Sequence, residues 1–258
     1  MKKLVHALVL TGLVGTSTFA MAAEESPHSL SANVGLYSDY IFRGISQTGG
    51  DPAIQGGLDY SHSSGFYLGT WGSNVGWIED FQGYDRGNME IDLYGGFRGG
   101  IGKTDFSFDV GAIQYLYPGD RNGATDADTT EIYGALGWKW FTAKYSYYVS
   151  DEVFGFADAD GSDYLGISAS VPVGETGLTL GANWGTFSFE NNSGQDYDDW
   201  GVSATYDMGK LSKVADGVTV GLKYTDTDAD KTAWTETITA DPQFLGEGTT
   251  TVWISKAF

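Results

Sequence analysis

Cysteine is absent from this 258-residue sequence, and proline and histidine are scarce, with five and three residues. Without cysteine, no disulfide contributes to the fold. Basic residues are also few, because 14 lysines and arginines stand against 34 aspartates and glutamates, for a net charge of −20. This balance argues against a nucleic-acid-binding protein, which presents lysine and arginine on its surface. After Met21, no apolar run is long enough for a transmembrane helix.

The first 22 residues have the layout of a secretory signal peptide. Two lysines follow Met1, a mostly apolar run follows them, and small residues surround a cleavage site expected after Ala22 or Ala23. The apolar run is too short for a membrane-spanning helix of about 20 residues. We therefore divide the chain into a signal peptide, 1–22, and one exported domain, 23–258.

Glycine and aromatic residues are abundant in the exported domain. The sequence contains 38 glycines, about twice the usual share of ~7%, and 15% of its residues are aromatic. A disordered chain would have few aromatics, and a collagen would show a strict glycine period. The combination favours an all-β chain with many bends.

Apolar and polar residues alternate with period two along most of this domain. In the clearest stretch, 89–98, Met89 and Leu93 fall on one face, and Glu90 and Asp92 fall on the other. We predict about twelve strands, each near the ~9–11 residues that cross a bilayer at a tilt. The other expected strands are 31–42, 53–61, 66–74, 105–112, 131–138, 141–149, 165–171, 177–184, 199–206, 217–225 and 250–258.

The connections between these strands alternate in length. Short ones are expected at 62–65, 99–103, 139–140 and 173–177, and long, mostly acidic ones at 74–88, 117–129, 150–162 and 226–248. Tight turns on one rim and long loops on the other predict a transmembrane up-and-down antiparallel β-barrel of the outer-membrane type. The connection 207–217 fits this pattern least well.

The size of the barrel determines which face points outward. About twelve strands enclose more space than apolar side chains alone would fill, since eight strands already enclose a packed interior. An apolar outer wall in water would also exceed the exposed patches that soluble monomers tolerate. We therefore expect apolar residues to face lipid and polar residues to face a lumen. Aromatic girdles are expected at both rims, from Trp138, Phe141, Tyr115, Tyr117, Trp184, Phe187 and Trp200.

The segment 38–75 carries a dense set of motif residues, namely Asp39, Tyr40, Phe42, Arg43, Gly44, Ser46, Thr48, Pro52, Ala53, Gln55, Gly56, Gly57, Gly65, Phe66, Tyr67, Gly69 and Trp71. In these residues it resembles the beginning of the TorF-type porins, a family of Gram-negative outer-membrane proteins. The last expected strand of the chain, 250–258, has alternating apolar residues and ends in Phe258. It resembles the signal that the bacterial outer-membrane assembly machinery reads. The resemblance implies an outer-membrane barrel and a pore, but no particular solute.

Charged residues on the expected inward face are the candidate pore lining. They would form an acidic wall opposed by fewer basic groups, which favours cations or neutral polar solutes. The alternative is an interior that is filled by its own salt bridges and conducts nothing. The candidates are Asp39, Arg43, Glu90, Asp92, Arg98, Asp105, Asp109, Glu131, Lys144 and Lys223.

Catalytic and metal sites have little support in the sequence. The exported domain keeps only His28 and His62, and although His62 and Ser64 form an H-x-S pair, they fall in an expected tight turn. The acidic stretches 158–163 and 226–230 lack the spacing of a calcium loop. We expect no enzyme activity, no cofactor and no structural metal, with weak divalent bridging between acidic loops and lipopolysaccharide as a hypothesis.

The sequence therefore predicts a porin-like channel of the bacterial outer membrane, through which small hydrophilic solutes diffuse passively. The alternative is a closed structural or surface-interaction barrel whose acidic loops bind ions or partners. The expected partners are membrane lipid, lipopolysaccharide and the assembly machinery, and nucleic acid is not among them.

Overall fold

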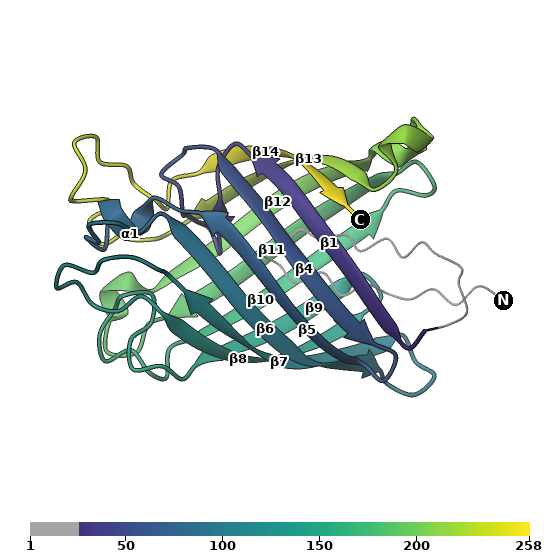
Figure 1. Ribbon diagram of the computed structural model, residues 1–258, viewed down its shortest axis with the longest axis horizontal. Coiled ribbons are helices and arrows are strands. Elements are labelled where there is room, and N and C mark those ends of the chain that lie inside the picture. The colour runs from purple at the N-terminus through teal and green to yellow at the C-terminus, as the bar shows by residue number, and fades with distance from the viewer. Residues whose placement is uncertain (1–25) are drawn as a thin grey trace.

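The computed structural model describes residues 26–258, so the predicted signal peptide lies outside the described residues. Twelve antiparallel strands form a closed barrel, as predicted, in which each strand pairs with its neighbours along the chain and β1 closes onto β14 (Figure 1). The barrel strands are β1 (His28–Tyr37), β4 (Ala53–His62), β5 (Phe66–Asn74), β6 (Met89–Gly100), β7 (Phe106–Leu116), β8 (Thr129–Trp138), β9 (Phe141–Tyr148), β10 (Asp163–Pro172), β11 (Leu178–Ser188), β12 (Tyr197–Asp207), β13 (Val218–Thr227) and β14 (Thr249–Ala257).

Alternation along each strand separates an apolar exterior from a polar interior. On β6, Met89 and Leu93 are each 49% exposed, whereas Glu90 and Asp92 are only 1% and 3% exposed. The same parity puts Leu36, Leu58, Val110 and other large apolar residues on the outer wall. The predicted orientation is thus confirmed: the exterior is the surface expected of a barrel surrounded by lipid.

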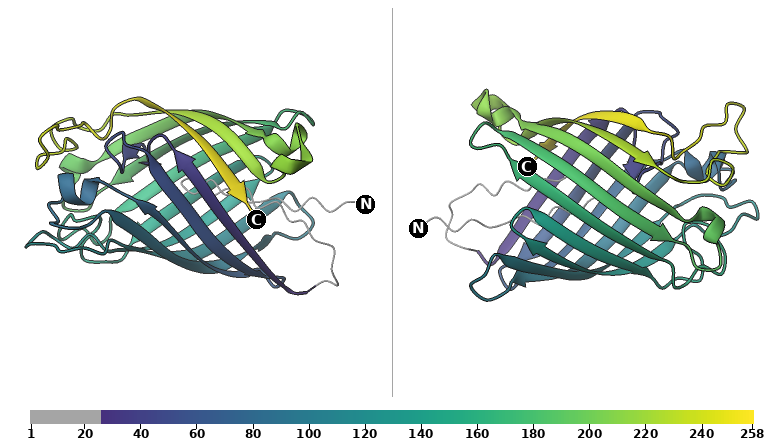
Figure 2. Two further views of the ribbon diagram at one scale, coloured as in Figure 1. Left: turned by 45° about the horizontal axis from the view of Figure 1, so that its top comes forward. Right: turned by 180° about the vertical axis from the view of Figure 1, so that it is seen from behind.

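The two ends of the barrel differ, as the connection lengths predicted (Figures 1 and 2). The long loops gather at one end, where the single-turn helix α1 (Trp77–Asp80) and the 3-10 turn η1 (Ser193–Gln195) lie. Short turns form the other end, and the connection 207–217 accommodates its extra length there in two 3-10 turns, η2 (Met208–Lys210) and η3 (Lys213–Ala215). Among the described residues, no helix is long and apolar enough to cross a membrane.

The seam between β1 and β14 closes the cylinder. The two strands pair in register from Asn33 opposite Ala257 to Tyr37 opposite Trp253. The backbone N–H of Phe258 donates to the carbonyl of Ala32 at 2.9 Å. Phe258 is therefore tied into the wall by its backbone.

The first predicted strand, 31–42, was placed wrongly. β1 ends at Tyr37, and the chain then leaves the wall to form a separate two-stranded hairpin, β2 (Ile41–Phe42) and β3 (Ile45–Ser46). Arg43 and Gly44 have φ of 47° and 85°, the left-handed pair that a two-residue hairpin turn requires. Asp39 and Arg43 therefore lie on this inserted segment and not on a barrel strand.

Asp105 and part of the aromatic girdle also differ from the prediction. The backbone N–H of Ile101 donates to the carbonyl of Phe106, so Asp105 lies within the turn and not on a strand. Its side chain is 57% exposed and lies 3.8 Å from Lys139 Nζ at the rim. Trp138, Phe141, Trp184 and Trp200 do face outward, but Tyr115, Tyr117 and Phe187 point into the barrel and are buried. These three residues fall on the positions that alternate inward, so they face the interior even though they lie near the strand ends.

Candidate functional site

The interior of the barrel is filled at the end that carries the long loops. Each barrel strand places a buried residue on the inner wall at this level, and together with the inserted hairpin these residues fill the lumen there. In strand order these residues include Gly35, Gln55, Trp71, Asp92, Tyr115, Glu131, Tyr148, Tyr164, Phe187, Tyr197, Thr225 and Thr251.

The hairpin of β2 and β3 is held in the lumen by hydrogen bonds at its base. Asp39 accepts hydrogen bonds from Ser46 Oγ at 2.7 Å and from Thr48 Oγ1 at 2.9 Å. The backbone N–H of Ser46 donates to the carbonyl of Leu245 in the β13–β14 loop at 2.8 Å. The backbone N–H of Gly76 donates to the carbonyl of Gln47 at 2.7 Å. The base of the hairpin is thus bonded both to itself and to the long loops above it.

Arg43, at the tip of the hairpin, makes the central contact with the wall. Its Nη2 lies 2.7 Å from Glu131 Oε2 on β8 and donates to Ser146 Oγ on β9 at 3.3 Å, while its Nη1 donates to the Tyr148 hydroxyl. The guanidinium also lies over the ring of Tyr164, 4.1 Å from its centroid. A planar, five-donor group is suited to such a pocket of carboxylate, hydroxyl and aromatic faces.

Glu131 is shared between the hairpin and the wall. Its Oε1 lies 2.8 Å from Lys144 Nζ and accepts a hydrogen bond from Ser146 Oγ at 2.8 Å, and the Tyr115 hydroxyl donates to Oε2 at 3.1 Å. The carboxylate is completely buried, and these donors offset its lost hydration. Glu131 therefore retains a cationic partner on the wall even when Arg43 is removed.

Glu90 and Asp92 form a second acidic group on the inner face of β6. The Tyr40 hydroxyl donates to Glu90 Oε1 at 3.0 Å, but Glu90 Oε2 and Asp92 Oδ1 are buried without a hydrogen-bond partner. Among the described residues, neither carboxylate takes part in an ion pair. This side of the filled lumen therefore carries acidic groups that no cation balances.

Tyrosine–carboxylate pairs line the inner wall. The hydroxyls of Tyr67, Tyr94 and Tyr164 donate to Asp109, Asp59 and Asp199, at 2.6, 2.6 and 2.7 Å. Arg98 lies over the Tyr67 ring, 4.9 Å from its centroid, and Lys144 and Lys223 point inward on β9 and β13. Seven of the ten predicted lining residues thus lie on the inner face of barrel strands, namely Glu90, Asp92, Arg98, Asp109, Glu131, Lys144 and Lys223.

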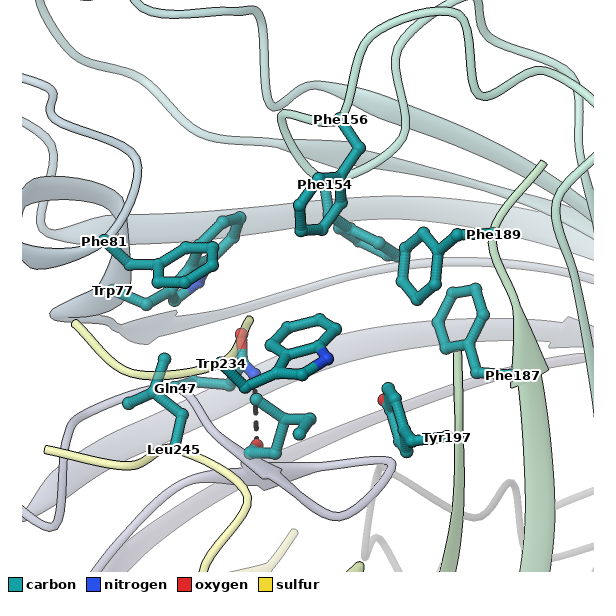
Figure 3. Close-up of a pocket in the computed structure, with 11 residues that line it drawn as sticks. Gln47, Trp77, Phe81, Phe154, Phe156, Phe187, Phe189, Tyr197, Trp234 and Leu245 are labelled. Carbon is teal, nitrogen blue, oxygen red and sulfur yellow. Dashed lines mark hydrogen bonds between the residues drawn. The ribbon is translucent and has the colours of Figure 1, made fainter. Parts of the chain in front are cut away.

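An aromatic cap covers the filled lumen (Figure 3). Its rings come from α1, from the loops and from the ends of β11 and β12, and they converge on one small space. That cavity measures about 30 Å³, which is room for about one water molecule. Ile45 of the hairpin and Gln47 directly after it also line this cavity, so the cap and the hairpin form one packed unit. The aromatic residues of the cap are Trp77, Phe81, Phe154, Phe156, Phe187, Phe189, Tyr197 and Trp234.

Carboxylates crowd the loops around the cap. Burial raises the pKa of Asp80 at the end of α1, and the charges of Glu79 and Asp51 raise it further. Burial likewise raises the pKa of Glu236, together with the charges of Asp80, Asp241 and Asp51, although the backbone N–H of Gln243 opposes this effect. The loops at this end are thus held together against mutual acidic repulsion.

Sequence reasoning missed the hairpin and the cap. The signal for the hairpin is the Arg43–Gly44 pair between the apolar residues Phe42 and Ile45, a hairpin pattern inside what looked like one continuous strand. The signal for the cap is the presence of large aromatics, such as Phe154 and Trp234, within long loops that are otherwise acidic.

Comparison with solved structures agrees with this architecture, which is that of a twelve-stranded porin-like barrel. A structure titled "KdgM porin" aligns with a TM-score of 0.51 over 88% of this chain and 99% of that one, at 9% identity. A second, "KdgM porin in complex with disordered oligogalacturonate", aligns with the same TM-score at 7% identity, over 89% and 97% of the two chains. Identities this low show a shared fold.

The chain belongs to the family described as "Bacterial protein of unknown function (Gcw_chp)", whose model matches residues 21–258. The resemblance to TorF-type porins is not confirmed under that name. No curated protein sequence matches the chain.

Proposed function

We propose that this protein is an outer-membrane channel for small hydrophilic solutes, held closed by the segment 38–52. One observation carries the proposal: a short hairpin enters a twelve-stranded barrel and is anchored to the wall through the ion pair of Arg43 with Glu131. A barrel that served only as a scaffold would be filled at least as well by apolar side chains, because a buried ion pair is often no more stabilising than an apolar replacement. An ionic contact between a loop and the wall suits a gate that opens.

The proposed location and orientation follow from the surface of the barrel. An apolar band surrounds the strands, long loops lie at one end and short turns at the other, which is the arrangement of outer-membrane barrels with their long loops outside the cell. In this setting, lipid and lipopolysaccharide contact the exterior, and β14 with Phe258 is the segment for the assembly machinery to bind.

The proposed solutes are cations or neutral polar molecules. Carboxylates outnumber cationic groups on the inner face, and Glu90 and Asp92 have no cationic partner among the described residues. One of the structures with the same fold holds oligogalacturonate, which is a polyanion. The acidic interior of this barrel would repel such a solute, so the shared barrel does not carry over that specificity.

A hairpin-deletion variant tests the channel. Tyr37 and Ala53 are cross-strand partners, so residues 38–52 can be replaced by a two-residue Asn-Gly turn without changing the register of β1 and β4. In planar bilayers, we expect rare or small openings from the intact protein and large, cation-selective steps from the variant. A folded variant without current would refute the channel, and anion-selective steps would refute the charge argument.

The alternative, a closed barrel that binds ions or partners through its loops, has one observation in its favour. The aromatic cap and the hairpin pack into a single unit with almost no internal space, as a permanent seal would. This alternative predicts that the hairpin-deletion variant is destabilised and conducts no better than the intact protein.

A further inference from the structure

The only two histidines in the described residues lie side by side at the short-turn end of the barrel, with their ring planes tilted by 55°. His28 begins β1 and His62 ends β4, and the register pairs them directly across the two strands. Their ring centroids are 5.2 Å apart. His28 is exposed and His62 is half-buried, and both share the outward parity of Leu30 and Leu58.

The distance between the rings matches a shared metal ion. Two imidazoles that bind one ion through bonds of about 2.0–2.1 Å at a tetrahedral angle place their ring centroids about 5 Å apart. Imidazole nitrogen suits Zn²⁺, Cu²⁺ and Ni²⁺. The strand pairing already holds the two rings at this separation.

The hydrogen bonds of the pair occupy one nitrogen of each ring. His28 Nδ1 lies 2.7 Å from the Tyr60 hydroxyl, and His62 Nδ1 lies 2.8 Å from Ser64 Oγ. Among the described residues, neither Nε2 makes a hydrogen bond. An oxygen partner on the far nitrogen is the usual support for a metal-bound histidine, since it fixes the orientation of the ring.

One contact opposes this arrangement. The backbone N–H of Ser64 also points at His62 Nδ1, at 3.2 Å, which favours the tautomer with its proton on Nε2. Metal binding through Nε2 requires the proton to move to Nδ1, from where it can be donated to Ser64 Oγ. His62 is only half-buried, so solvent can carry this proton exchange.

We propose that His28 and His62 bind one divalent transition-metal ion, such as Zn²⁺ or Cu²⁺, at the short-turn rim. The pair supplies two ligands, and water completes the coordination, because the described residues hold no group of three or more His, Cys, Asp or Glu side chains placed for a metal. The ion would connect the first barrel strand to its neighbour. This site lies outside the expectation, made from the sequence, that the protein has no metal site.

Copper binding to the purified, tag-free barrel tests the site. We expect one Cu²⁺ per chain at micromolar concentrations, with electron paramagnetic resonance showing coupling to imidazole nitrogen. His28→Gln and His62→Gln should each weaken binding about a hundredfold, because each loses a ligand held at high effective concentration. Asp160→Asn, an exposed acid in a long loop, is the matched control and should bind like the intact protein.

Two results would overturn the proposal. The first is copper binding that survives in the double histidine variant or shows only oxygen coordination, which would assign the ion to the acidic loops. The second is the absence of binding to the intact protein, which would leave the pair as a packing contact. Neither result bears on conductance, so the channel proposal is tested independently.

Discussion

Replacing Arg43 with methionine is the sharpest test of the gate. The substitution removes the guanidinium from Glu131, Ser146 and Tyr148 but keeps an apolar stem in the aromatic surroundings. Removing one partner of a buried ion pair costs about 3–5 kcal/mol. Since Lys144 stays 2.8 Å from Glu131 and still balances its charge, we expect the lower end of that range, about 3 kcal/mol.

We expect this cost to destabilise the closed position of the hairpin. The barrel itself is not destabilised, because its strands remain paired. At about 1.4 kcal/mol per tenfold change, the ratio of open to closed protein should rise about a hundredfold. Single-channel recording in planar bilayers measures the open probability directly. Arg43→Lys, which keeps the charge but loses the planar fork, should give an intermediate value.

The control is Arg98→Met, which removes an inward-facing arginine that contacts Tyr67 and has no contact with the hairpin. It should leave the open probability unchanged. If Arg43→Met migrates as a folded barrel in a heat-modifiability gel and still opens as rarely as the intact protein, the ion pair of Arg43 does not hold the gate closed.

Three further predictions concern the gate and the charge selectivity of the channel. Gly44→Ala should also raise the open probability, because a Cβ at φ 85° would lie 2.5 Å from the Thr227 methyl and 2.7 Å from Asp199 Cβ; unchanged recordings would show that the turn can shift. Asp80 and Glu236 have raised pKa values in the folded loops, so their protonated forms stabilise the closed arrangement of these loops. This stabilisation is fully present below their ordinary acid range and is lost as the pH rises through the raised pKa values. Openings should therefore become rarer from neutral pH to about pH 4, and the double variant Asp80→Asn, Glu236→Gln should flatten this dependence. In a conducting hairpin-deletion background, Glu90→Lys with Asp92→Lys should reduce cation preference, as measured by the reversal potential in a salt gradient; an unchanged potential would remove both residues from the ion path.

The strand pattern was readable because each barrel residue has only two environments. Lipid and lumen alternate along every strand, so the side chains of β6 show in the sequence which way they point. Parity also predicted the inward position of Glu131 and Lys144 correctly. These residues could be placed without knowing which strand pairs with which.

The partners of these residues could not be predicted in the same way. Arg43 contacts Glu131 across 88 positions of sequence, and nothing in the local pattern specifies that distance. The segment around Arg43 continues the alternation of β1, so periodicity alone predicts a strand across the turn. The aromatic cap depends on loops from four connections meeting above the barrel, and loop positions follow from tertiary contacts and not from periodicity.

The seam between β1 and β14 has a consequence for the order of folding. It joins Asn33 to Ala257, nearly the full length of the chain, so the entropy of closing that loop is unfavourable until the intervening strands have assembled. Ring closure is therefore expected as the last step, and until then both edge strands offer unpaired backbone groups to other chains. A chaperone that shields these edges would protect the protein during the interval in which it is most prone to aggregate.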